Sequence, residues 1–507
     1  MVSSVNKIKN SNEINEIVNS AKKEGKKIIL CHGAFDLMHN GHIKHLQKAK
    51  TLGEILIVSI TADNYILKGP GRPFFNQSIR SESIAALACV NYVFISESFT
   101  AIESIRSVKP NFYCKGSDYK NIKNDITKNI EKEINEVKKY GGNIFHTDEI
   151  VFSSSSLINQ FFSDQSDETK EFIKYFKEKN QLNSVFKKID SLKDTKVLVI
   201  GESIIDEYTF VTPLGQTGKG GMLSVLEDRS ERYAGGSLAV ANHISDFVNH
   251  VDLFTGLSTN QTEKNFYLKN LKKNIRPIFV KLFDKPLTKK RYLDSDLVRY
   301  FEIYSAEKIT DLEKTKTKIV LSKLKTIIKK YDLVICTDFG NGFLNDELRD
   351  YISDNAKFLA VNTQINSGNR GYHTINKYKK VSYVSLNEPE IRLALHNSTE
   401  EIEIAAEKIC KKNKIKYLSI TRGKNGVMSY TGKKFFFVPA LTNNYVDRVG
   451  AGDAFLAISS LIVYKFKLLG LASFLGSIAA SIKLQSICNK ESVDIVRFKK
   501  YLTTLYK

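Results

Sequence analysis

A chain of 507 residues is too long for one ordinary domain, and its 42% hydrophobic share is enough for sizeable cores. The net charge of +21 is typical of some nucleic-acid binders. The lysines are spread along the chain, however, and no basic block alternates with aromatic residues, so we expect no nucleic-acid partner.

Cysteine usage and apolar runs narrow the class of protein further. The six cysteines are far apart without a C-x-x-C pair, which favours free buried thiols over disulfides or a zinc site. The N-terminus lacks an apolar signal core, which indicates the cytoplasm. The most apolar stretch, residues 454–482, is interrupted by Lys465 and Lys467, so a pair of core helices explains it better than a membrane span.

The first part of the chain alternates helical and strand patterns. A weak helical pattern covers residues 10–24, and apolar strands are predicted over 27–30 and 55–61 with a helix over 43–50 between them. Residues 85–95 should form a helix and then a strand. Strand, turn, helix and strand form a parallel unit, and ligands of such sheets bind beyond the strand ends.

The turn after the first strand carries candidate phosphate ligands, in the sequence C-H-G-A-F-D-L-M-H-N-G-H from Cys31 to His42. His39 and His42 lie three residues apart at a helix start, and Gly41 allows close backbone approach. Both imidazoles can donate to phosphate oxygens and stabilise charge during nucleotidyl transfer. A metal site completed by His45 is the second interpretation, and a pair of surface histidines is the third.

This turn resembles the H-x-G-H segment of the cytidylyltransferase-like nucleotidyltransferases, in which both histidines bind nucleotide phosphates. The similarity continues through K-G-P-G-R-P at residues 68–73, Arg80, K-G-S-D-Y at residues 115–119 and a serine run at residues 152–158 that resembles the ADP-heptose-synthase branch. Alone, the serine run would only cap a helix. One departure is H-G-A-F at residues 32–35, where close relatives carry N-G-C-F.

The resemblance implies a Rossmann-like nucleotidyltransferase domain over residues 1–164. Its catalytic residues would be His39, His42 and Lys68. Its phosphate-binding residues would be Gly33, Phe35, Gly41, Arg72, Lys115, Ser154 and Ser155. Residues 165–195 are charged, with scattered apolar positions and neither Gly nor Pro, so one or two helices should join the domains.

A glycine turn opens the strongest motif of the second part, the sequence D-R-V-G-A-G-D-A-F at residues 447–455. Gly450 and Gly452 permit a tight turn before a buried helix predicted over residues 454–463, and the unpaired amides there form an anion site. Asp453 lies beside that site and can take a proton from an attacking hydroxyl. The alternative is an Asp that only caps the helix.

This stretch resembles the second signature of the PfkB (ribokinase-like) carbohydrate kinases. Buried strands are predicted over residues 196–200, 333–337, 384–386 and 418–421, and several end in segments similar to that family. The segments are G-E-S-I-I-D (201–206, with Glu202 in place of an Asp), A-G-G-S-L-A-V-A-N (234–242), T-K-K-R (288–291), D-F-G-N-G (338–342), N-E-P-E (387–390) and T-R-G-K-N-G (421–426).

The resemblance implies a ribokinase-like α/β domain with a small β lid over residues 196–507, and a base at Asp453. Phosphates of the nucleotide would meet Thr421, Gly423, Gly426, Gly450, Ala451 and Gly452. Substrate would meet Asp206, Gly235, Gly236, Asn242, Lys289 and Arg291, although surface charge is an alternative for the last two. Mg²⁺ would lie near Asn387 and Glu390.

One loop departs from the heptose kinases of this family. Their R-I-S-P-E-A-P-V-P segment is absent, and residues 215–223 stand in its place. Because that loop is expected to contact substrate, the identity of the sugar stays open.

The chain, except for the N-terminal helix and the join, therefore resembles a bifunctional ADP-heptose synthase with the domain order reversed. The resemblance implies ATP as the phosphate donor of the kinase, ATP or CTP in the other domain, and a nucleotide-activated, heptose-like sugar for a surface glycan as product. It also implies a homodimer through the kinase domain. Two alternatives stay open: a CTP-dependent transferase for an alcohol or polyol phosphate fused to a different sugar kinase, and a ligand-binding scaffold without catalysis.

Overall fold

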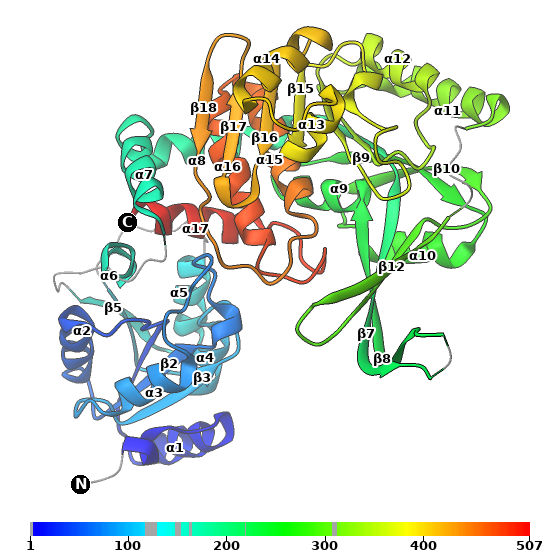
Figure 1. Ribbon diagram of the computed structural model, residues 1–507. Helices are drawn as coiled ribbons and strands as arrows, with labels where there is room; N and C mark the ends of the chain where they lie inside the picture. Colours follow the sequence, from blue (N-terminus) through cyan, green and yellow to red (C-terminus); the bar gives the residue numbers. More distant parts are fainter. Residues whose placement is uncertain (1–3, 117–128, 148–153, 162–164, 219, 307–311) are drawn as a thin grey trace. The chain divides into compact units, whose positions relative to one another are not determined.

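The chain folds into two compact units (Figure 1). The computed structural model describes residues 4–116, 129–147, 154–161, 165–218, 220–306 and 312–507. The first unit comprises Met1–Asp164 together with Lys499–Lys507, and the second comprises Gln165–Phe498. The last nine residues, which we expected in the second domain, therefore belong to the first unit.

A five-stranded parallel sheet with the order β3-β2-β1-β4-β5 forms the centre of the first unit. The strands are β1 (Ile28–Gly33), β2 (Ile55–Thr61), β3 (Tyr92–Ser96), β4 (Phe112–Gly116) and β5 (Asn143–Thr147). The helices are α1 (Ser11–Lys23), α2 (Asn40–Lys50), α3 (Gln77–Ala85), α4 (Ile102–Val108), α5 (Asn129–Lys139) and α6 (Ser154–Phe161).

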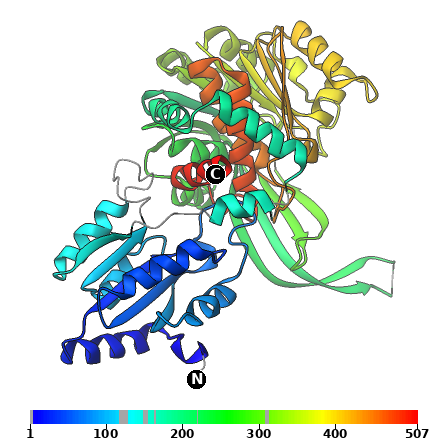
Figure 2. The ribbon, with the colours of Figure 1, turned by 90° about the vertical axis from the view of Figure 1, so that its left-hand side faces the viewer.

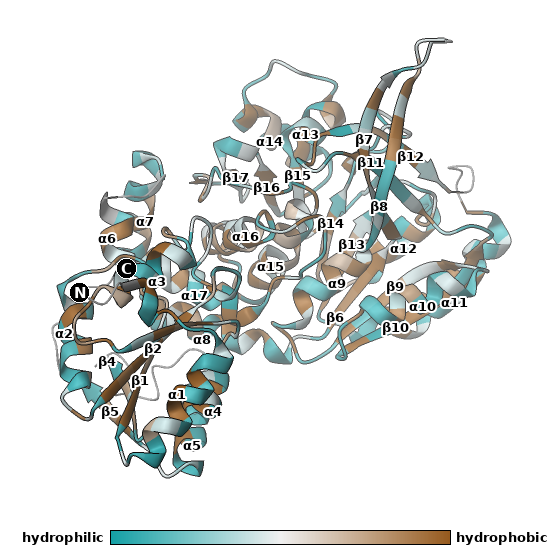
Figure 3. Cartoon of the chain, turned by 90° about the horizontal axis from the view of Figure 1, so that it is seen from below, coloured by the Kyte–Doolittle hydropathy of each residue, from teal (hydrophilic) through white to brown (hydrophobic). Residues whose placement is uncertain are grey.

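Helices cover both faces of this sheet because both faces are apolar. Successive side chains of a strand point to opposite sides. In β1, Ile29 and Cys31 belong to one core with residues of α2 and α3, whereas Ile28 and Leu30 belong to another with residues of α1, α4 and α5. Figure 3 shows β1 and β2 as predominantly hydrophobic strands. This is the expected doubly wound α/β arrangement.

The chain leaves β1 at a topological switch point. It continues to β2 and β3 on one side of β1 and only later to β4 and β5 on the other side. A crevice for ligands forms at the carboxyl ends of strands where the order reverses in this way. The segment that contains His39 and His42 follows β1 directly.

The expected helix within residues 85–95 is wrong. Helix α3 begins earlier, because the side chain of Asn76 caps it by accepting a hydrogen bond from the N–H of Ile79, and it already ends at Ala85. The strand part of the prediction is confirmed by β3.

The second unit contains a nine-stranded sheet with the order β10-β9-β6-β13-β14-β15-β16-β17-β18. These strands are β6 (Val197–Gly201), β9 (Val251–Ser258), β10 (Ile275–Phe283), β13 (Leu333–Asp338), β14 (Leu359–Thr363), β15 (Tyr383–Asn387), β16 (Tyr417–Thr421), β17 (Val427–Tyr430) and β18 (Phe435–Val438). All pairs are parallel except β16–β17 and β17–β18.

The second unit also contains helices and a second, four-stranded sheet. The helices are α7 (Asp167–Lys179), α8 (Leu182–Asp190), α9 (Ser237–Ser245), α10 (Gln261–Asn270), α11 (Lys314–Ile327), α12 (Asp346–Asn355), α13 (Glu388–Leu395), α14 (Ile402–Lys412), α15 (Ala451–Phe466) and α16 (Leu469–Lys483). Helix α17 (Ile495–Tyr506) begins in the second unit, but its residues from Lys499 onward belong to the first. The second sheet, which we call the lid, has the order β12-β11-β7-β8 and comprises β7 (Ser203–Gln216), β8 (Leu223–Gly236), β11 (Thr288–Leu293) and β12 (Arg299–Ser305).

Several expectations for this part of the chain are confirmed. Helices α7 and α8 occupy the segment that was predicted to contain one or two helices. Helices α15 and α16 form the predicted buried pair. All six cysteines are free. Among the described residues, no helix combines the length and the apolar character that crossing a membrane requires.

The hairpin β7–β8 extends well beyond the rest of its unit (Figures 1 and 2). The first nine residues of β7 are buried and its last five are exposed. Gly215 lies about 30 Å along the strand from Asp206 at ~3.3 Å per residue. The loop at residues 215–223 therefore lies at the tip of the hairpin, so the expectation that it contacts a substrate bound beside Asp206 is wrong for a single protomer.

Candidate active sites

The two histidines of the first unit lie against one another. Helix α2 begins directly after His39, and the rings of His39 and His42 stack with centroids 3.9 Å apart at 21°. The ring of Phe35 meets His42 edge-on at 5.3 Å. Both nitrogens of His39 and Nδ1 of His42 are buried without a hydrogen-bond partner within the described part of the chain. Buried polar atoms normally have partners, so these nitrogens are suited to receive a ligand.

Their surroundings keep both imidazoles neutral at pH 7. Burial lowers the pKa of His39, and burial together with the nearby His39, Lys68 and His45 lowers the pKa of His42 to about 3. A neutral imidazole carries one N–H donor and one acceptor. The pair can therefore donate to phosphate oxygens without carrying charge. The third histidine of the metal interpretation, His45, is hydrogen-bonded through Nδ1 to Oγ1 of Thr147 at 2.8 Å.

The loop at residues 68–73 supplies positive charge to this site. Burial lowers the pKa of Lys68 to about 8, and Asp36 opposes that shift. The guanidinium of Arg72 lies 3.7 Å from the carboxylate of Asp36 and donates to Oδ1 of Asn159 at 2.8 Å. Asp36 in turn accepts hydrogen bonds from the N–H groups of residues 74 and 75, which follow the loop.

Two serines of α6 contact the same site, whereas the ammonium group of Lys115 is paired with a carboxylate. Ser154 Oγ donates to the carbonyl of Leu37 at 3.3 Å, and the carbonyl of Ser155 accepts from Arg72 at 3.4 Å. Lys115 forms a buried ion pair with Glu133 at 3.1 Å. Gly33 closes β1 beside Phe35, and Gly41 lies in the first turn of α2. The rest of the K-G-S-D-Y segment (117–119) and residues 152–153 lie outside the described residues.

The second unit places a carboxyl group beside an open helix N-terminus. Gly450, with φ 85°, precedes α15, and a Cβ there would lie 2.2 Å from Oδ1 of Asn489, so only glycine fits. A Cβ at Gly452 would meet nothing within 4 Å. The first N–H groups of a helix have no intrahelical acceptor, so the turn at Gly450, Ala451 and Gly452 is a ready anion site.

Asp453, in the first turn of α15, lies near charged groups of the lid and of α16. Burial and the neighbouring Asp206 raise the pKa of Asp453 to about 7, although Lys289 and Lys483 oppose the shift. Its side chain keeps some exposure to solvent. A carboxyl group that titrates near neutral pH is suited to accept a proton in a reaction.

Strand pairing in the lid brings the charged residues together. In the parallel pair β7–β11, Lys289 lies opposite Asp206 and Arg291 lies two residues further. Arg291 pairs with Asp206 at 2.5 Å and with Glu302 at 2.7 Å. Burial lowers the pKa of Lys289, and both Asp206 and Asp453 act against this effect. The lid therefore presents a buried ammonium group close to Asp453.

Gly235 and Gly236 pack closely against Asp206 and Glu202. The side chain of Asn242, by contrast, is hydrogen-bonded to backbone groups outside this cluster. A Cβ on Gly235 would lie 2.0 Å from Oδ2 of Asp206, and one on Gly236 would lie 2.3 Å from the carbonyl of Glu202. Asn242 donates to the carbonyl of Asn270 at 2.9 Å and accepts from the N–H of residue 272 at 3.2 Å. A substrate contact by Asn242 would require exchanging one of these bonds.

The predicted nucleotide and metal residues lie at the ends of neighbouring strands. Asn387 ends β15 opposite Thr421, the last residue of β16. Asn387 and Glu390 form a capping box at the start of α13. Burial raises the pKa of Glu390 to about 7, and Asp453 contributes to this shift. The loop after Thr421 turns through Gly423 (φ 58°) and Gly426 (φ 72°). Among the described residues, no group of three or more His, Cys, Asp and Glu is arranged to hold a metal ion.

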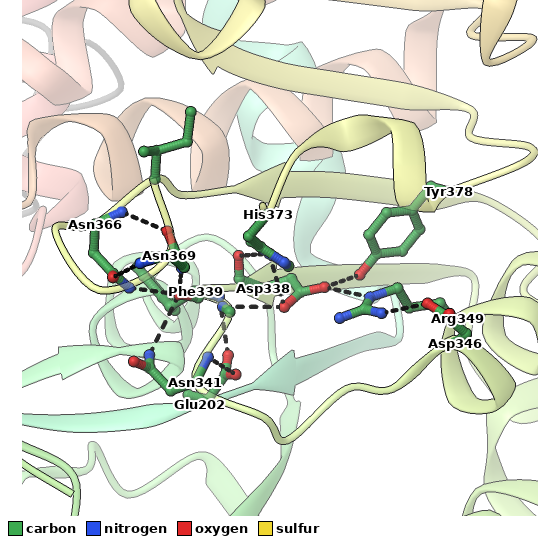
Figure 4. A network of polar contacts seen from close by, with 12 residues as sticks. Glu202, Asp338, Phe339, Asn341, Asp346, Arg349, Asn366, Asn369, His373 and Tyr378 are labelled. Atoms are coloured by element: carbon green, nitrogen blue, oxygen red, sulfur yellow. Dashed lines mark hydrogen bonds and ion pairs between the residues drawn. The ribbon is translucent and has the colours of Figure 1, made fainter. Parts of the chain in front are cut away.

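A buried polar network supports the turn after β13 (Figure 4). Glu202 accepts hydrogen bonds from the N–H groups of Phe339 and Asn341 at 3.0 and 3.1 Å. Asp338 accepts from Arg349 and from the hydroxyl of residue 378, both at 2.9 Å. Burial opposes ionisation of Asp338, but His373 and Arg349 outweigh it and lower its pKa. Glu202, which stands where the family usually has an Asp, therefore stabilises the backbone of the turn after β13.

Replacing Arg349 by Ala is expected to destabilise the second unit by about 3–5 kcal/mol, because it leaves the charge of Asp338 buried with one partner fewer. The side chains of Arg349 and Asp338 are 3% and 0% exposed. Urea unfolding followed by circular dichroism measures the loss. Asp346→Ala, which removes the 81% exposed partner of the same arginine, should cost less than about 1 kcal/mol. Equal costs for the two variants would contradict this account.

Comparison with known proteins agrees with this geometry. Residues 194–486 match the model of the pfkB family carbohydrate kinases. The chain belongs to the pfkB family. Residues 30–161 match the cytidylyltransferase-like model, so one chain carries both kinds of domain.

Curated relatives of this pfkB protein include bifunctional proteins named HldE. The one from Pelobacter propionicus is 42% identical over 115 residues, which cover 22% of this chain and 24% of the relative. The one from a Nitratiruptor species is 43% identical over 129 residues, which cover 25% and 28%. The chain thus spans about a quarter of the length of the curated relatives it matches.

A solved structure supports the fold of the pfkB unit. Phosphofructokinase-2 from Escherichia coli in complex with potassium aligns with 61% of this chain and 99% of its own, with a TM-score of 0.50 and 13% identity. At this identity the likeness concerns the fold alone, and it confirms the expected ribokinase-like architecture.

Sequence reasoning missed several residues of both sites. Asp447 accepts hydrogen bonds from Tyr208 at 2.7 Å and from Arg299 at 2.7 Å, and so holds the turn before Gly450 in place. In the first unit, Lys500 and Lys507 contribute positive charge at Lys68. No motif links these lysines to a loop more than four hundred residues earlier, whereas Asp447 lies inside the motif already identified.

Proposed function

We propose that the protein is a bifunctional sugar kinase and sugar-phosphate nucleotidyltransferase that makes a nucleotide-activated, heptose-like sugar for surface glycan synthesis. One observation carries the proposal: each unit has its own cluster of buried polar and charged groups that is suited to bind phosphate. The first unit has stacked His39 and His42 with unpartnered nitrogens. The second has Asp453 at a glycine-opened helix N-terminus beside Lys289. The match to both family models supports it.

In the kinase step, Asp453 accepts the proton of a sugar hydroxyl as that oxygen attacks the γ-phosphorus of ATP and ADP leaves. The amides of Gly450–Gly452 donate hydrogen bonds to the oxygens of the transferring group. Lys289 and Arg291 would bind anionic or hydroxyl groups of the substrate, and the ion pair with Asp206 would orient Arg291.

Magnesium fits the same site through one carboxylate. Enzymes of both families use nucleoside triphosphates, generally with Mg²⁺. Glu390 is buried, its pKa is raised to about 7, and Asp453 contributes to the shift, so a divalent cation would favour the ionised form of both groups. Mg²⁺ keeps several waters and needs few protein ligands. Asn387 would contribute its oxygen only in exchange for its bond to the N–H of Glu390. The bound ion would neutralise phosphate charge.

In the transfer step, a phosphate oxygen of the sugar phosphate attacks the α-phosphorus of ATP or CTP, and pyrophosphate leaves. His39 and His42 donate to the phosphates, and Lys68 neutralises their charge. The loop of Arg72 and the N-terminus of α6, with Ser154 and Ser155, bind the remaining oxygens.

Pyrophosphate release, measured with each nucleoside triphosphate and a panel of sugar and alcohol phosphates, tests this proposal. Release with a sugar phosphate and ATP or CTP is expected. Release only with an alcohol or polyol phosphate and CTP would favour the fusion of two unrelated activities, and nucleotide binding without any turnover would favour a scaffold.

The rate of sugar phosphorylation should rise with pH through about 7 and level off above it. Burial raises the pKa of Asp453 to about 7, so the group is protonated below that pH and cannot accept the hydroxyl proton. The rate should therefore fall about tenfold per pH unit on the acidic side. The measurement is kcat/KM for Mg²⁺-ATP against pH, because this ratio reports the pKa values of the enzyme before Mg²⁺-ATP binds. A rate that stays flat from about pH 5.5 to 8 would contradict the role of Asp453.

Location and assembly complete the proposal. The cytoplasm suits a pathway that consumes nucleoside triphosphates. A homodimer through the kinase unit is supported by the lid, whose strands and β7–β8 loop expose large apolar side chains. These are Leu214, Met222, Leu223, Leu226, Phe301 and Ile303.

A further inference from the structure

The loop at residues 68–73 of the first unit is in contact with the last nine residues of the chain. A Cβ on Gly69 would lie 2.0 Å from Cδ2 of Tyr501 and 2.5 Å from its Cε2, so the ring lies directly on the backbone of the loop. Tyr501 is only 3% exposed. Gly71, in the same loop and also at positive φ, has nothing within 4 Å of the corresponding position. The contact is therefore local to Gly69.

A second contact joins the same segment to Arg72. The carbonyl of Thr504 accepts a hydrogen bond from Nδ2 of Asn159 at 2.7 Å. Oδ1 of Asn159 accepts from Arg72 at 2.8 Å. This orientation of the amide is the one that satisfies both neighbours, because a carbonyl cannot donate and a guanidinium cannot accept. The side chain of Arg72 is 6% exposed, so losing this acceptor would leave a buried donor group with only its longer bond, at 3.4 Å, to the carbonyl of Ser155.

The charge of the segment matches a phosphate site. Lys500 and Lys507 lie close enough to Lys68 to lower its pKa, together with Arg72. Four cationic groups, Lys68, Arg72, Lys500 and Lys507, therefore lie at one loop. Among the charged groups with the largest effects on the pKa of Lys68, only Asp36 raises it. Such an accumulation favours a polyanion as ligand.

We infer that Tyr501 and Asn159 are positioning residues for nucleotidyl transfer, because they hold the loop Lys68–Pro73 in the shape in which it meets a nucleoside triphosphate. The inference rests on the proposed transferase function and assigns to it a segment that follows the kinase unit in the sequence. Neither residue touches the reacting atoms. Their removal releases the loop, so it weakens nucleotide binding more than the chemical step.

Steady-state kinetics of pyrophosphate release test the inference. Tyr501→Ala and Asn159→Leu should each raise KM for the nucleotide about tenfold or more and change kcat by less than about threefold. Tyr501→Phe, which retains the ring on Gly69, should restore KM to within about threefold of the native value. Sugar phosphorylation by the same preparations should stay at the native rate and shows that the chain is folded.

Thr503→Ala is the matched control. Thr503 lies on α17 between Tyr501 and Thr504. Its side-chain hydroxyl donates to the carbonyl of Lys499 in the same helix. KM should not change in this variant. Native KM in both Tyr501→Ala and Asn159→Leu would overturn the inference. So would a loss confined to kcat, because a positioning role predicts a loss in binding.

Amide hydrogen exchange distinguishes a failure of this inference from a failure of the proposed transferase function. If the native protein releases no pyrophosphate with any triphosphate, the transferase proposal fails. The role in nucleotidyl transfer then fails with it, and amide exchange of a peptide that covers residues 68–75 decides the structural part of the inference, which is that Tyr501 holds the loop. Faster exchange in Tyr501→Ala than in the native protein and in Thr503→Ala supports it, and equal exchange in all three overturns it.

Discussion

Asp453→Asn is expected to lower kcat for sugar phosphorylation by about 10²–10⁴-fold, because the amide has the shape of the carboxylate but cannot accept the hydroxyl proton. The anion site at Gly450–Gly452 is formed by backbone and should persist. KM for ATP should therefore change little, and pyrophosphate release by the first unit should stay at the native rate. A coupled assay for ADP together with a pyrophosphate assay measures both.

The control for this variant is a neutralised carboxylate elsewhere in the same unit. Asp354 is exposed on α12, and Asp354→Asn should leave both activities unchanged. Phosphorylation by Asp453→Asn at the native rate would show that another group is the base. The result would also remove the reason for the expected acid limb of the pH profile.

His42→Ala is expected to lower the rate of pyrophosphate release by about 10²–10³-fold, the usual effect of losing one donor to a transition-state oxygen. The ring of His42 is stacked on His39, and its Nδ1 is buried without a partner among the described residues. His42→Gln keeps an N–H donor of similar reach and should lose less activity than His42→Ala. Phosphorylation of sugar should be unaffected in both variants.

Two results would contradict that role of His42. Equal losses in His42→Ala and His42→Gln would mean that the ring acts by packing and not by donation. Loss of phosphorylation alongside pyrophosphate release would mean that the substitution unfolds the chain, or that the two activities share one site.

The contiguous motifs allowed much of both sites to be predicted. His39 and His42 are brought together by one helix turn, and Gly450 to Asp453 by a glycine turn that opens α15. Such local arrangements follow from spacing and from backbone geometry, which are visible in the sequence. The strands at both sheet centres were predictable for the same reason, because they are apolar runs bounded by turns.

The remainder of the sites depends on contacts between distant segments. Asp453 owes its raised pKa partly to Asp206, a residue of the lid, and no local pattern shows that pairing. Tyr501 lies on Gly69 only because the last nine residues belong to the first unit. Asn242 matches a motif but is used by backbone groups of a neighbouring loop. The tertiary structure determines the pKa of Asp453, the contact of Tyr501 and the hydrogen bonds of Asn242, and a local motif could not predict them.

Nucleotide stoichiometry tests the central claim most directly, because two separate triphosphate sites in one chain bind two nucleotides. Equilibrium dialysis with Mg²⁺ and ATP, CTP, GTP or UTP measures the number bound at saturation. We predict two per chain, either of one nucleotide or of a pair added together, and one per chain once Lys68 is replaced by Ala. Saturation at one nucleotide per chain under every combination would contradict the account.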